Sequence, residues 1–311
     1  MATMKAVRLH GYGGPEMLRY EDCPRPEPAA GEVLVRVHAA GVNPVDWKVR
    51  AGYAKGFLNY TLPIVIGWDF SGVVESVGAG VTPWKPGDEV YSRPDISRAG
   101  AYAEYIAVRA SEIALKPKSL DHVHAAAIPL AALTAWQALE AGGLSAGQKI
   151  LIHAAAGGVG TFAVQFAKLK SACVAGTASG CNLEFLRELG VDEPIDYQTA
   201  RFEDVIQDAD MVLDAMAGEV RTRSWKALKK GGILVSILGP PSEEEAKAHG
   251  VRGAGVMVQA NGQQLAEIAR LVDAGKVKVI LDAVLPLSEA NKAHELNATG
   301  HTRGKIVLRV I

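Results

Sequence analysis

The 311-residue chain is long enough for two domains, and its 49% hydrophobic and 22% charged residues are typical of a globular protein with a large core. A formal net charge of −1, with both signs scattered along the chain, argues against a nucleic-acid partner. The sequence shows no signal-peptide pattern and no apolar run of about 20 residues, which argues against a membrane span; its three cysteines form no C-x-x-C pair, so we expect a cytoplasmic protein.

The first third of the chain predicts a β-rich unit of short strands separated by turns. Apolar and polar residues alternate at 5–10 and 32–38, as they do in half-buried strands. Further strand-like segments follow at 71–78, 88–92 and 103–108, with Gly and Pro residues between them.

The pattern changes near residue 122. A mostly helical run covers 122–142 and is interrupted at Pro129. From 149 onward strand and helix patterns alternate, which predicts a parallel sheet with helices on both faces. A capped amphipathic helix at 261–274 and a closing strand at 304–311 complete the chain. The expected alternation is strand 149–154, helix 159–170, strand 172–177, helix 182–189, strand 194–197, a short helix near 202–207, strand 210–216, helix 220–229 and strand 232–238.

The segment "KILIHAAAGGVGTFAVQFAK" runs from a strand pattern through small residues into a helix pattern. In the G-x-G-x-x-G register it reads Ala155, Gly157 and Gly160. Gly157 leaves the backbone bare for a pyrophosphate, Gly160 allows close helix–strand packing, and Ala155 can make the turn if its φ stays negative. The amides of Gly158 and Val159 would then face the phosphates. The alternative is packing alone, but the order strand–glycines–helix favours a dinucleotide site.

The end of the second strand indicates which dinucleotide binds. A site that prefers NAD usually ends this strand with an acidic residue on the ribose 2′-hydroxyl. This strand ends in "GTASG", and no carboxylate follows until Glu184. Thr177 and Ser179 leave room for a 2′-phosphate and can bond to it, so we expect NADPH. The alternative is that the two hydroxyls cap the next helix.

Six segments carry a family pattern: "GEVLVRVHAAGVNPVDWKVRAGY" (31–53), "LPIVIGWDFSGVVESVGAGVTPWKPGDEVY" (62–91), "GAYAEYIAV" (100–108), "AAAIPLAALTAWQAL" (125–139), "AAAGGVG" (154–160) and "GKIVL" (304–308). Taken together, they resemble the zinc-free, quinone oxidoreductase-like branch of the medium-chain dehydrogenase/reductase superfamily. The resemblance implies an α/β fold with a GroES-like β-rich domain at 1–122, completed by 261–311, and a doubly wound Rossmann cofactor domain at 123–260. It also implies a homodimer, formed through the apolar segment 253–259 as the last Rossmann strand.

The resemblance also bears on a metal site. Zinc-dependent relatives carry a Cys where this chain has Asn43, and a His-Glu pair where it has Trp68 and Asp69. Only the carboxylates of Asp46 and Asp69 remain as candidate ligands, which is too few for a tetrahedral zinc site. We therefore expect no metal.

Without a Lewis acid, hydride transfer from NADPH to a quinone or an α,β-unsaturated carbonyl is the favoured chemistry. Asn43 is the candidate donor to the acceptor oxygen, Tyr53 a donor or stacking partner, and Trp68 a pocket wall. For Asn43 the alternative is an Asx turn before Pro44. For Tyr53 it is simple surface packing.

Family positions suggest Thr134 near the nicotinamide amide, Tyr197 near the 2′-phosphate and Lys305 near the cofactor. Gly239 is expected where the last central strand ends at the cofactor cleft. Two alternatives stay open for the function: an enoyl-thioester reductase of the same superfamily, and a non-catalytic NADPH-binding protein of the crystallin or trafficking type.

Overall fold

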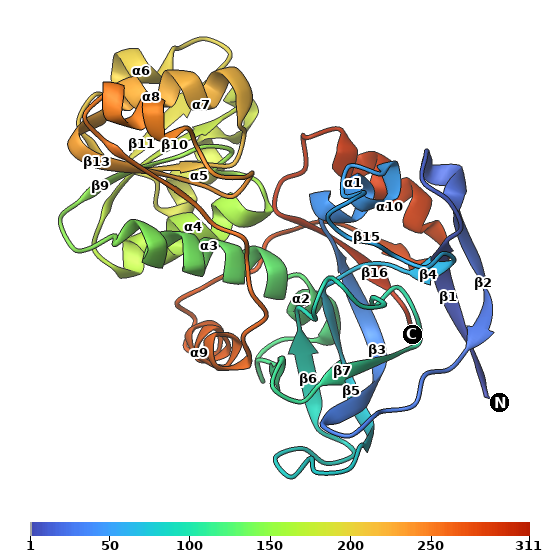
Figure 1. Ribbon diagram of the computed structural model, residues 1–311. Helices are drawn as coiled ribbons and strands as arrows, with labels where there is room; N and C mark the ends of the chain where they lie inside the picture. The colour runs from blue at the N-terminus through green and yellow to red at the C-terminus, as the bar shows by residue number, and fades with distance from the viewer. Residues whose placement is uncertain (1) are drawn as a thin grey trace. The chain divides into compact units, whose positions relative to one another are not determined.

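The computed structural model describes residues 2–311, and the chain forms two compact units. Unit 1 comprises the residues up to 133 together with 259–311, and unit 2 comprises 134–258. Figure 1 shows the course of the chain through both units.

Unit 1 is built on two β-sheets. Strand β16 (Lys305–Arg309) pairs antiparallel with the end of β3 (Glu32–Val42), in a register that sets Ile306 opposite Val42. The first residue of β16, Lys305, is thereby placed beside Asn43, the residue that follows β3. The larger sheet has the order β15 (Leu281–Pro286), β16 (Lys305–Arg309), β3 (Glu32–Val42), β5 (Phe70–Val77), β6 (Glu89–Ser92) and β8 (Ile113–Leu115), with β7 (Tyr105–Arg109) also paired to β3. The smaller sheet has the order β2 (Leu18–Pro24), β1 (Thr3–Leu9) and β4 (Ile64–Val65).

Four helices of unit 1 pack around these sheets. They are α1 (Pro44–Ala51), α2 (His122–Ala126), α9 (Gly262–Asp273) and α10 (Ala290–Ala298). α2 packs on β3 and β5, and for this reason the helical residues before 134 belong to unit 1. The sequence placed the domain boundary at 122, where the composition changes. The chain instead passes between the units inside α3 (Pro129–Gly142).

Unit 2 is a six-stranded, all-parallel sheet covered by helices. Its strand order is doubly wound, running outward in both directions from the first strand of the unit. Figure 1 shows α6, α7 and α8 on one face of this sheet, and α3 and α4 on the other. The strands in order are β11 (Glu193–Asp196), β10 (Cys173–Ala178), β9 (Lys149–Ile152), β12 (Ala209–Asp214), β13 (Leu228–Ser236) and β14 (Arg252–Gly255). The helices are α4 (Gly158–Leu169), α5 (Leu183–Leu189), α6 (Phe202–Val205), α7 (Gly218–Ser224) and α8 (Glu243–Ala248).

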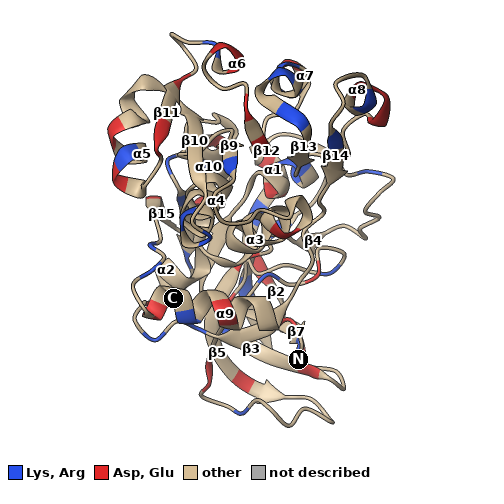
Figure 2. Ribbon diagram, turned by 90° about the vertical axis from the view of Figure 1, so that its left-hand side faces the viewer, with Lys and Arg blue, Asp and Glu red and all other residues tan. Residues whose placement is uncertain are grey.

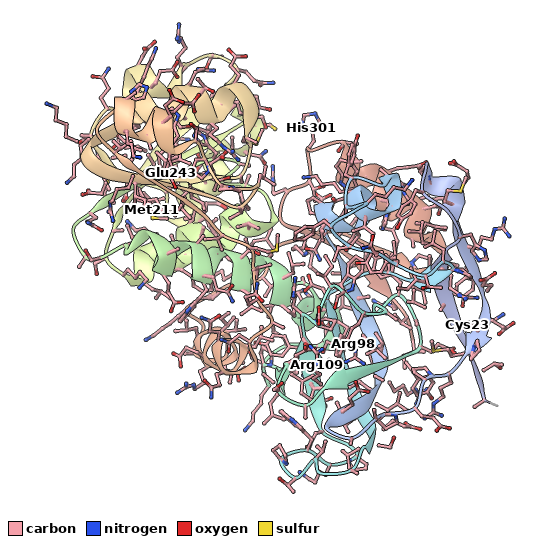
Figure 3. All side chains as sticks on the ribbon, in the orientation of Figure 1. Cys23, Arg98, Arg109, Met211, Glu243 and His301 are labelled. Atoms are coloured by element: carbon pink, nitrogen blue, oxygen red, sulfur yellow. The ribbon has the colours of Figure 1, made fainter. Side chains whose placement is uncertain are left out.

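Close packing in unit 2 depends on small residues facing large ones. The buried side chain of Met211, on β12, lies in the core of this unit (Figure 3). A Cβ atom on Gly142 of α3 would collide with the Met211 sulfur, so glycine lets α3 lie close to the sheet.

The expected α/β fold is confirmed, with local differences. The predicted helix 220–229 ends earlier, because α7 stops at Ser224 and a 3₁₀ turn leads into β13 at Leu228. Of the predicted edge strand 253–259, only the first residues are in a strand, as part of β14 (Arg252–Gly255). It stops at Gly255 because its partner β13 ends opposite, at Ser236, before the Gly239–Pro241 turn. β2 was not predicted, since its charged residues break the alternating pattern.

Figure 2 shows Lys and Arg residues and Asp and Glu residues scattered over the ribbon, and the net charge is −1. Within residues 2–311, none of the helices combines the length and the apolar character that crossing a bilayer requires.

Candidate functional site

The glycine-rich turn of unit 2 connects β9 to α4. Ala154 carries the left-handed conformation in this turn, with φ +51°, and Ala155 does not. Ala155 is buried, and its amide donates to the carbonyl oxygen of Thr177 at 3.0 Å. Alanine therefore serves at the first position of the fingerprint because the strained conformation is taken by its neighbour.

Gly157 and Gly160 have different surroundings. A Cβ atom on Gly160 would collide with the backbone of Ala154 and Ala155, so this glycine is required for packing. A Cβ on Gly157 would meet only the Ala154 carbonyl oxygen, at 3.3 Å. Gly157 is the N-cap of the 12-residue α4, whose first ladder bond runs from the Thr161 amide to Gly157. The amides of the helix residues before Thr161, which include Gly158 and Val159, are available to an anion.

The end of β10 is organised by His153. The Thr177 hydroxyl is buried and lies 3.2 Å from His153 Nδ1, and His153 Nε2 lies 2.8 Å from the Ser224 hydroxyl. Burial lowers the pKa of His153 to about 4, so its imidazole is neutral at physiological pH. The Thr177 side chain is therefore buried and in contact with His153 inside unit 2. Ser179 is half-buried, and its hydroxyl accepts a hydrogen bond from Asn182 Nδ2 at 3.0 Å.

Two more residues flank this strand end. Tyr197 follows β11 and its side chain is 51% exposed. Asp196, which the sequence analysis missed, lies in register with Ala178, and its carboxylate comes close to the bare Cα of Gly180. The sequence spacing hides this carboxylate, because only the pairing of β10 with β11 brings it to the strand end.

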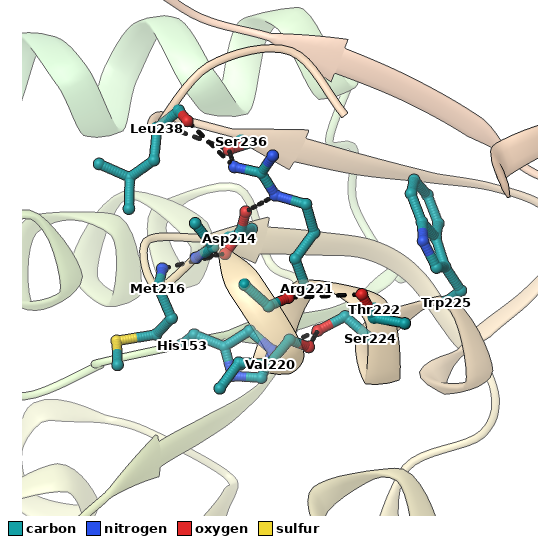
Figure 4. Close-up of polar contacts among 12 residues, drawn as sticks. His153, Asp214, Met216, Val220, Arg221, Thr222, Ser224, Trp225, Ser236 and Leu238 are labelled. Carbon is teal, nitrogen blue, oxygen red and sulfur yellow. Dashed lines mark hydrogen bonds and ion pairs between the residues drawn. The ribbon is translucent and has the colours of Figure 1, made fainter. Parts of the chain in front are cut away.

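An ion pair between the buried Asp214 and the half-buried Arg221 holds the ends of β12 and β13 (Figure 4). Asp214 Oδ2 accepts from Arg221 Nε at 2.6 Å, and its Oδ1 accepts from the Met216 and Ala217 amides. The same guanidinium donates to the Ser236 hydroxyl at 2.6 Å. Gly239 follows with φ +92°, past the end of β13. The carboxyl ends of parallel strands carry the ligands of doubly wound sheets, so these contacts shape the candidate cofactor edge.

In unit 1, Asn43 lies at the centre of a buried cluster. It is the N-cap of α1, and its backbone N–H donates to Asp46 Oδ2 at 2.8 Å. Its side-chain Nδ2 donates to Asp69 Oδ2 at 2.8 Å, and its Oδ1 accepts from Lys305 Nζ. Lys305 Nζ also donates to the Val42 carbonyl oxygen at 3.1 Å and to Asp69 at 3.2 Å. Asn43 therefore starts the helix and also belongs to a polar cluster that the sequence did not reveal.

The carboxylates of this cluster are tied to the fold. Asp46 Oδ2 accepts from the Tyr102 hydroxyl at 2.7 Å, and burial raises the pKa of Asp46 to about 7. Asp69 also accepts from the Leu130 amide at 2.6 Å. Burial raises the pKa of Asp69, while the Lys305 ammonium opposes that rise.

The other site residues predicted in unit 1 lie in different surroundings. Trp68 is fully buried, and its indole N–H donates to the Arg98 carbonyl oxygen at 3.2 Å. Tyr53 is 76% exposed and packs edge-on against Trp47. Thr134, in α3, is the first residue of unit 2 and is buried.

The donor set around Asn43 does not fit a divalent metal ion. It comprises one amide and the carboxylates of Asp46 and Asp69, and the Lys305 ammonium already lies against Asn43 and Asp69. Across residues 2–311, no group of three or more His, Cys, Asp or Glu side chains is arranged to hold a metal.

Two family models and several known proteins are similar to this chain. The alcohol dehydrogenase GroES-like domain model matches residues 29–118, and the zinc-binding dehydrogenase model matches residues 189–308. The chain is 38% identical to 2-methylene-furan-3-one reductase from Solanum lycopersicum, covering all of this chain and 80% of that protein. It is 37% identical to the chloroplastic NADPH-dependent alkenal/one oxidoreductase of Arabidopsis thaliana, covering 98% and 79%.

A solved structure extends the likeness to the whole fold. The quinone oxidoreductase from Coxiella burnetii superposes with a TM-score of 0.94 at 37% identity, covering 100% of both chains. The chain belongs to the quinone oxidoreductase-like branch of the medium-chain dehydrogenase/reductase superfamily. The GroES-like match lies within unit 1 and contains Asn43, Asp46 and Asp69. As a member of this branch, the protein is an oxidoreductase of the nicotinamide-dependent type.

Proposed function

We propose that this quinone oxidoreductase-like protein is an NADPH-dependent reductase of quinones or α,β-unsaturated carbonyls that works without zinc. The observation that carries the proposal is the Asn43 amide held between Lys305 and Asp69, because it supplies a fixed hydrogen-bond donor where zinc-dependent relatives have a metal ligand. The similar proteins, which include a quinone oxidoreductase and an alkenal/one oxidoreductase, support the same acceptor class.

The cofactor contacts of the proposal lie in unit 2. The turn at Ala155–Gly160 would hold the pyrophosphate on the amides of α4. We propose that the Ser179 hydroxyl, at the end of β10, contacts the 2′-phosphate, since β10 itself carries no acidic residue and the nearby Asp196 carboxylate belongs to β11. Tyr197, Gly239 and Thr134 are the proposed further contacts. NADPH bound there supplies a hydride from its nicotinamide ring.

In unit 1, the residues would act on the acceptor. Hydride addition to a quinone or an enone carbon places negative charge on the acceptor oxygen, and the reaction is completed by a proton. The Asn43 side chain donates one Nδ2–H to Asp69 and has a second Nδ2–H for that oxygen. A donor already in place stabilises the developing charge without reorganising water. Tyr53 is the proposed second contact with the acceptor.

Turnover of purified protein tests the acceptor class. NADPH absorbance is followed with benzoquinone, naphthoquinone, a simple enone and an enoyl thioester. We expect turnover with the quinones or the enone. Preference for the thioester supports the enoyl-thioester alternative. Tight NADPH binding with no turnover of any acceptor would favour a non-catalytic NADPH-binding protein.

Zinc independence is tested separately. Dialysis against a chelator is expected to leave the rate unchanged, and added zinc is expected not to increase it. A rate that falls on chelation and returns with zinc would contradict this part of the proposal.

A further inference from the structure

We propose that Lys305 is a positioning residue for acceptor reduction: its buried ammonium orients and polarises the Asn43 amide, replacing the charge of a metal ion by an internal organic cation. The inference rests on the proposed function. It assigns Lys305 a task other than the cofactor contact expected from its place in the sequence.

The ammonium has no capacity left for another ligand. Lys305 is 4% exposed, and its three N–H bonds match three acceptors: the Val42 carbonyl oxygen, Asn43 Oδ1 and Asp69 Oδ2. A buried charge is tolerated only when it is paired and fully hydrogen-bonded, and this one is. Its position follows from the pairing of β16 with β3, which joins residues 262 apart in the chain.

This arrangement permits only one orientation of the Asn43 amide. Its oxygen faces the Lys305 ammonium, and its nitrogen faces the Asp69 carboxylate. The reversed amide would set NH₂ against the ammonium and an oxygen against the carboxylate, so both contacts would become repulsive. The second Nδ2–H consequently points in a direction that the ion pair determines.

The ammonium also strengthens that remaining donor. A cation hydrogen-bonded to an amide oxygen withdraws electron density from the amide, and coupled hydrogen bonds reinforce one another in a buried, low-dielectric site. The Nδ2–H of Asn43 becomes a better donor to an acceptor oxygen as charge develops there. The benefit is largest for acceptors that stabilise the added charge poorly, so an enone should depend on Lys305 more than benzoquinone does.

The test compares Lys305→Met with a control, Lys292→Met, whose exposed ammonium pairs with Glu289 on the surface of the same unit. We expect kcat/KM to fall about 10-fold for benzoquinone and about 100-fold to 1,000-fold for the enone, mainly through kcat. NADPH affinity should stay within about twofold of wild type, since the three donors of Lys305 serve Val42, Asn43 and Asp69. Equal losses for all acceptors, or a loss confined to NADPH affinity, would overturn the inference.

Removing Lys305 alone leaves Asp69 buried without its cation, which can impair folding. The double variant Lys305→Met/Asp69→Asn removes both charges and leaves Asn43 in place. It should fold, as judged by thermal unfolding, and show the same graded loss. Retention of wild-type rates by this folded variant would contradict the inference.

A second measurement does not depend on turnover. The side-chain amide resonances of Asn43, assigned with an Asn43→Ala variant, report the polarisation of its N–H bonds. We expect them to shift upfield in the double variant compared with Asp69→Asn alone, because these two proteins differ only at Lys305. An unchanged resonance overturns the role of Lys305 even if the acceptors are reduced. A shifted resonance in a protein that reduces no acceptor contradicts only the proposed function.

Discussion

Gly157 and Gly160 lie three residues apart in the same turn, yet different neighbours account for them. Gly160 is in contact with protein backbone on the side where a Cβ would stand, whereas Gly157 has one carbonyl oxygen nearby and otherwise open space. Packing explains the first glycine, and the approach of a ligand explains the second under the proposed function.

This difference predicts opposite phenotypes for two identical substitutions. Gly160→Ala should lower the free energy of unfolding by about 3 kcal/mol, because backbone atoms must move. Gly157→Ala should keep nearly wild-type stability and weaken NADPH binding about 10-fold or more, because the new methyl group occupies the space for the pyrophosphate. Thermal unfolding and NADPH titration of both variants check this, and a Gly157→Ala protein that binds NADPH normally would contradict the assigned site.

Ser179 is the residue on which the NADPH preference can be tested. Ser179→Asp introduces a carboxylate at the end of β10, where it would repel a 2′-phosphate and accept from a 2′-hydroxyl. We expect the ratio of kcat/KM for NADPH to that for NADH to fall about 100-fold, that is by about 3 kcal/mol. Ser179→Ala is the control, with a loss of less than 10-fold. An unchanged ratio in Ser179→Asp would show that the 2′-phosphate lies elsewhere.

At the scale of elements, α6 and α7 are joined by a charge pair that closes one face of unit 2. Glu203 of α6 accepts from Arg223 of α7 at 2.8 Å and 2.6 Å, and from Arg201 at 2.9 Å. The Glu203 carboxylate is buried, and its hydrogen bonds with Arg223 lower its pKa to about 2. α6 spans only four residues, so it depends on this pair and on the burial of Phe202.

The pKa of Glu203 predicts a pH-dependent contribution to stability. Because it is lower in the folded than in the unfolded chain, the contribution is complete above pH about 4.5 and is lost as the pH falls towards 2. Glu203→Gln should lower the free energy of unfolding by about 2 kcal/mol at pH 7, and the difference from wild type should vanish near pH 2. Urea unfolding across pH checks this, with the exposed neighbour Asp204→Asn as control. A deficit that persists unchanged at low pH would rule out the ion pair as its cause.

At the scale of the whole molecule, β14 leaves one edge of the parallel sheet unpaired within the chain. Open edges invite pairing, and Met257, just beyond β14, is 62% exposed. We propose that two chains meet at this edge to form the homodimer expected from the sequence.

Met257→Glu should therefore convert a dimer into monomers, because two like charges would be buried in the interface. Light scattering during gel filtration measures the mass. Val205→Glu, at an exposed position on α6, should leave the dimer intact. A wild-type protein that is monomeric at micromolar concentration, or a Met257→Glu variant that remains dimeric, would exclude this interface.

Local pattern was sufficient to predict much of the fold. The alternation of strands and helices after residue 149 indicated the parallel sheet, and the predicted helix 182–189 is observed as α5, which ends at Leu189. Elements whose signal is weak were missed, such as β2 with its charged residues. The domain boundary was misplaced because packing, not composition, assigns the residues of α2 to unit 1.

The sequence by itself determined the glycine turn, the βαβ order and the lack of an acidic residue within β10 itself, because each depends on residues close together in the chain. Only the tertiary structure decided what surrounds Asn43. Lys305 lies 262 residues from Asn43 in the chain and Asp69 lies 26 residues from it, and both are brought to Asn43 by strand pairing. A local sequence pattern cannot predict such long-range contacts. Asp196 came to the end of β10 in the same way, by pairing of β11 with β10. Local sequence specifies the backbone of this protein, whereas long-range packing brings together the charges of its site.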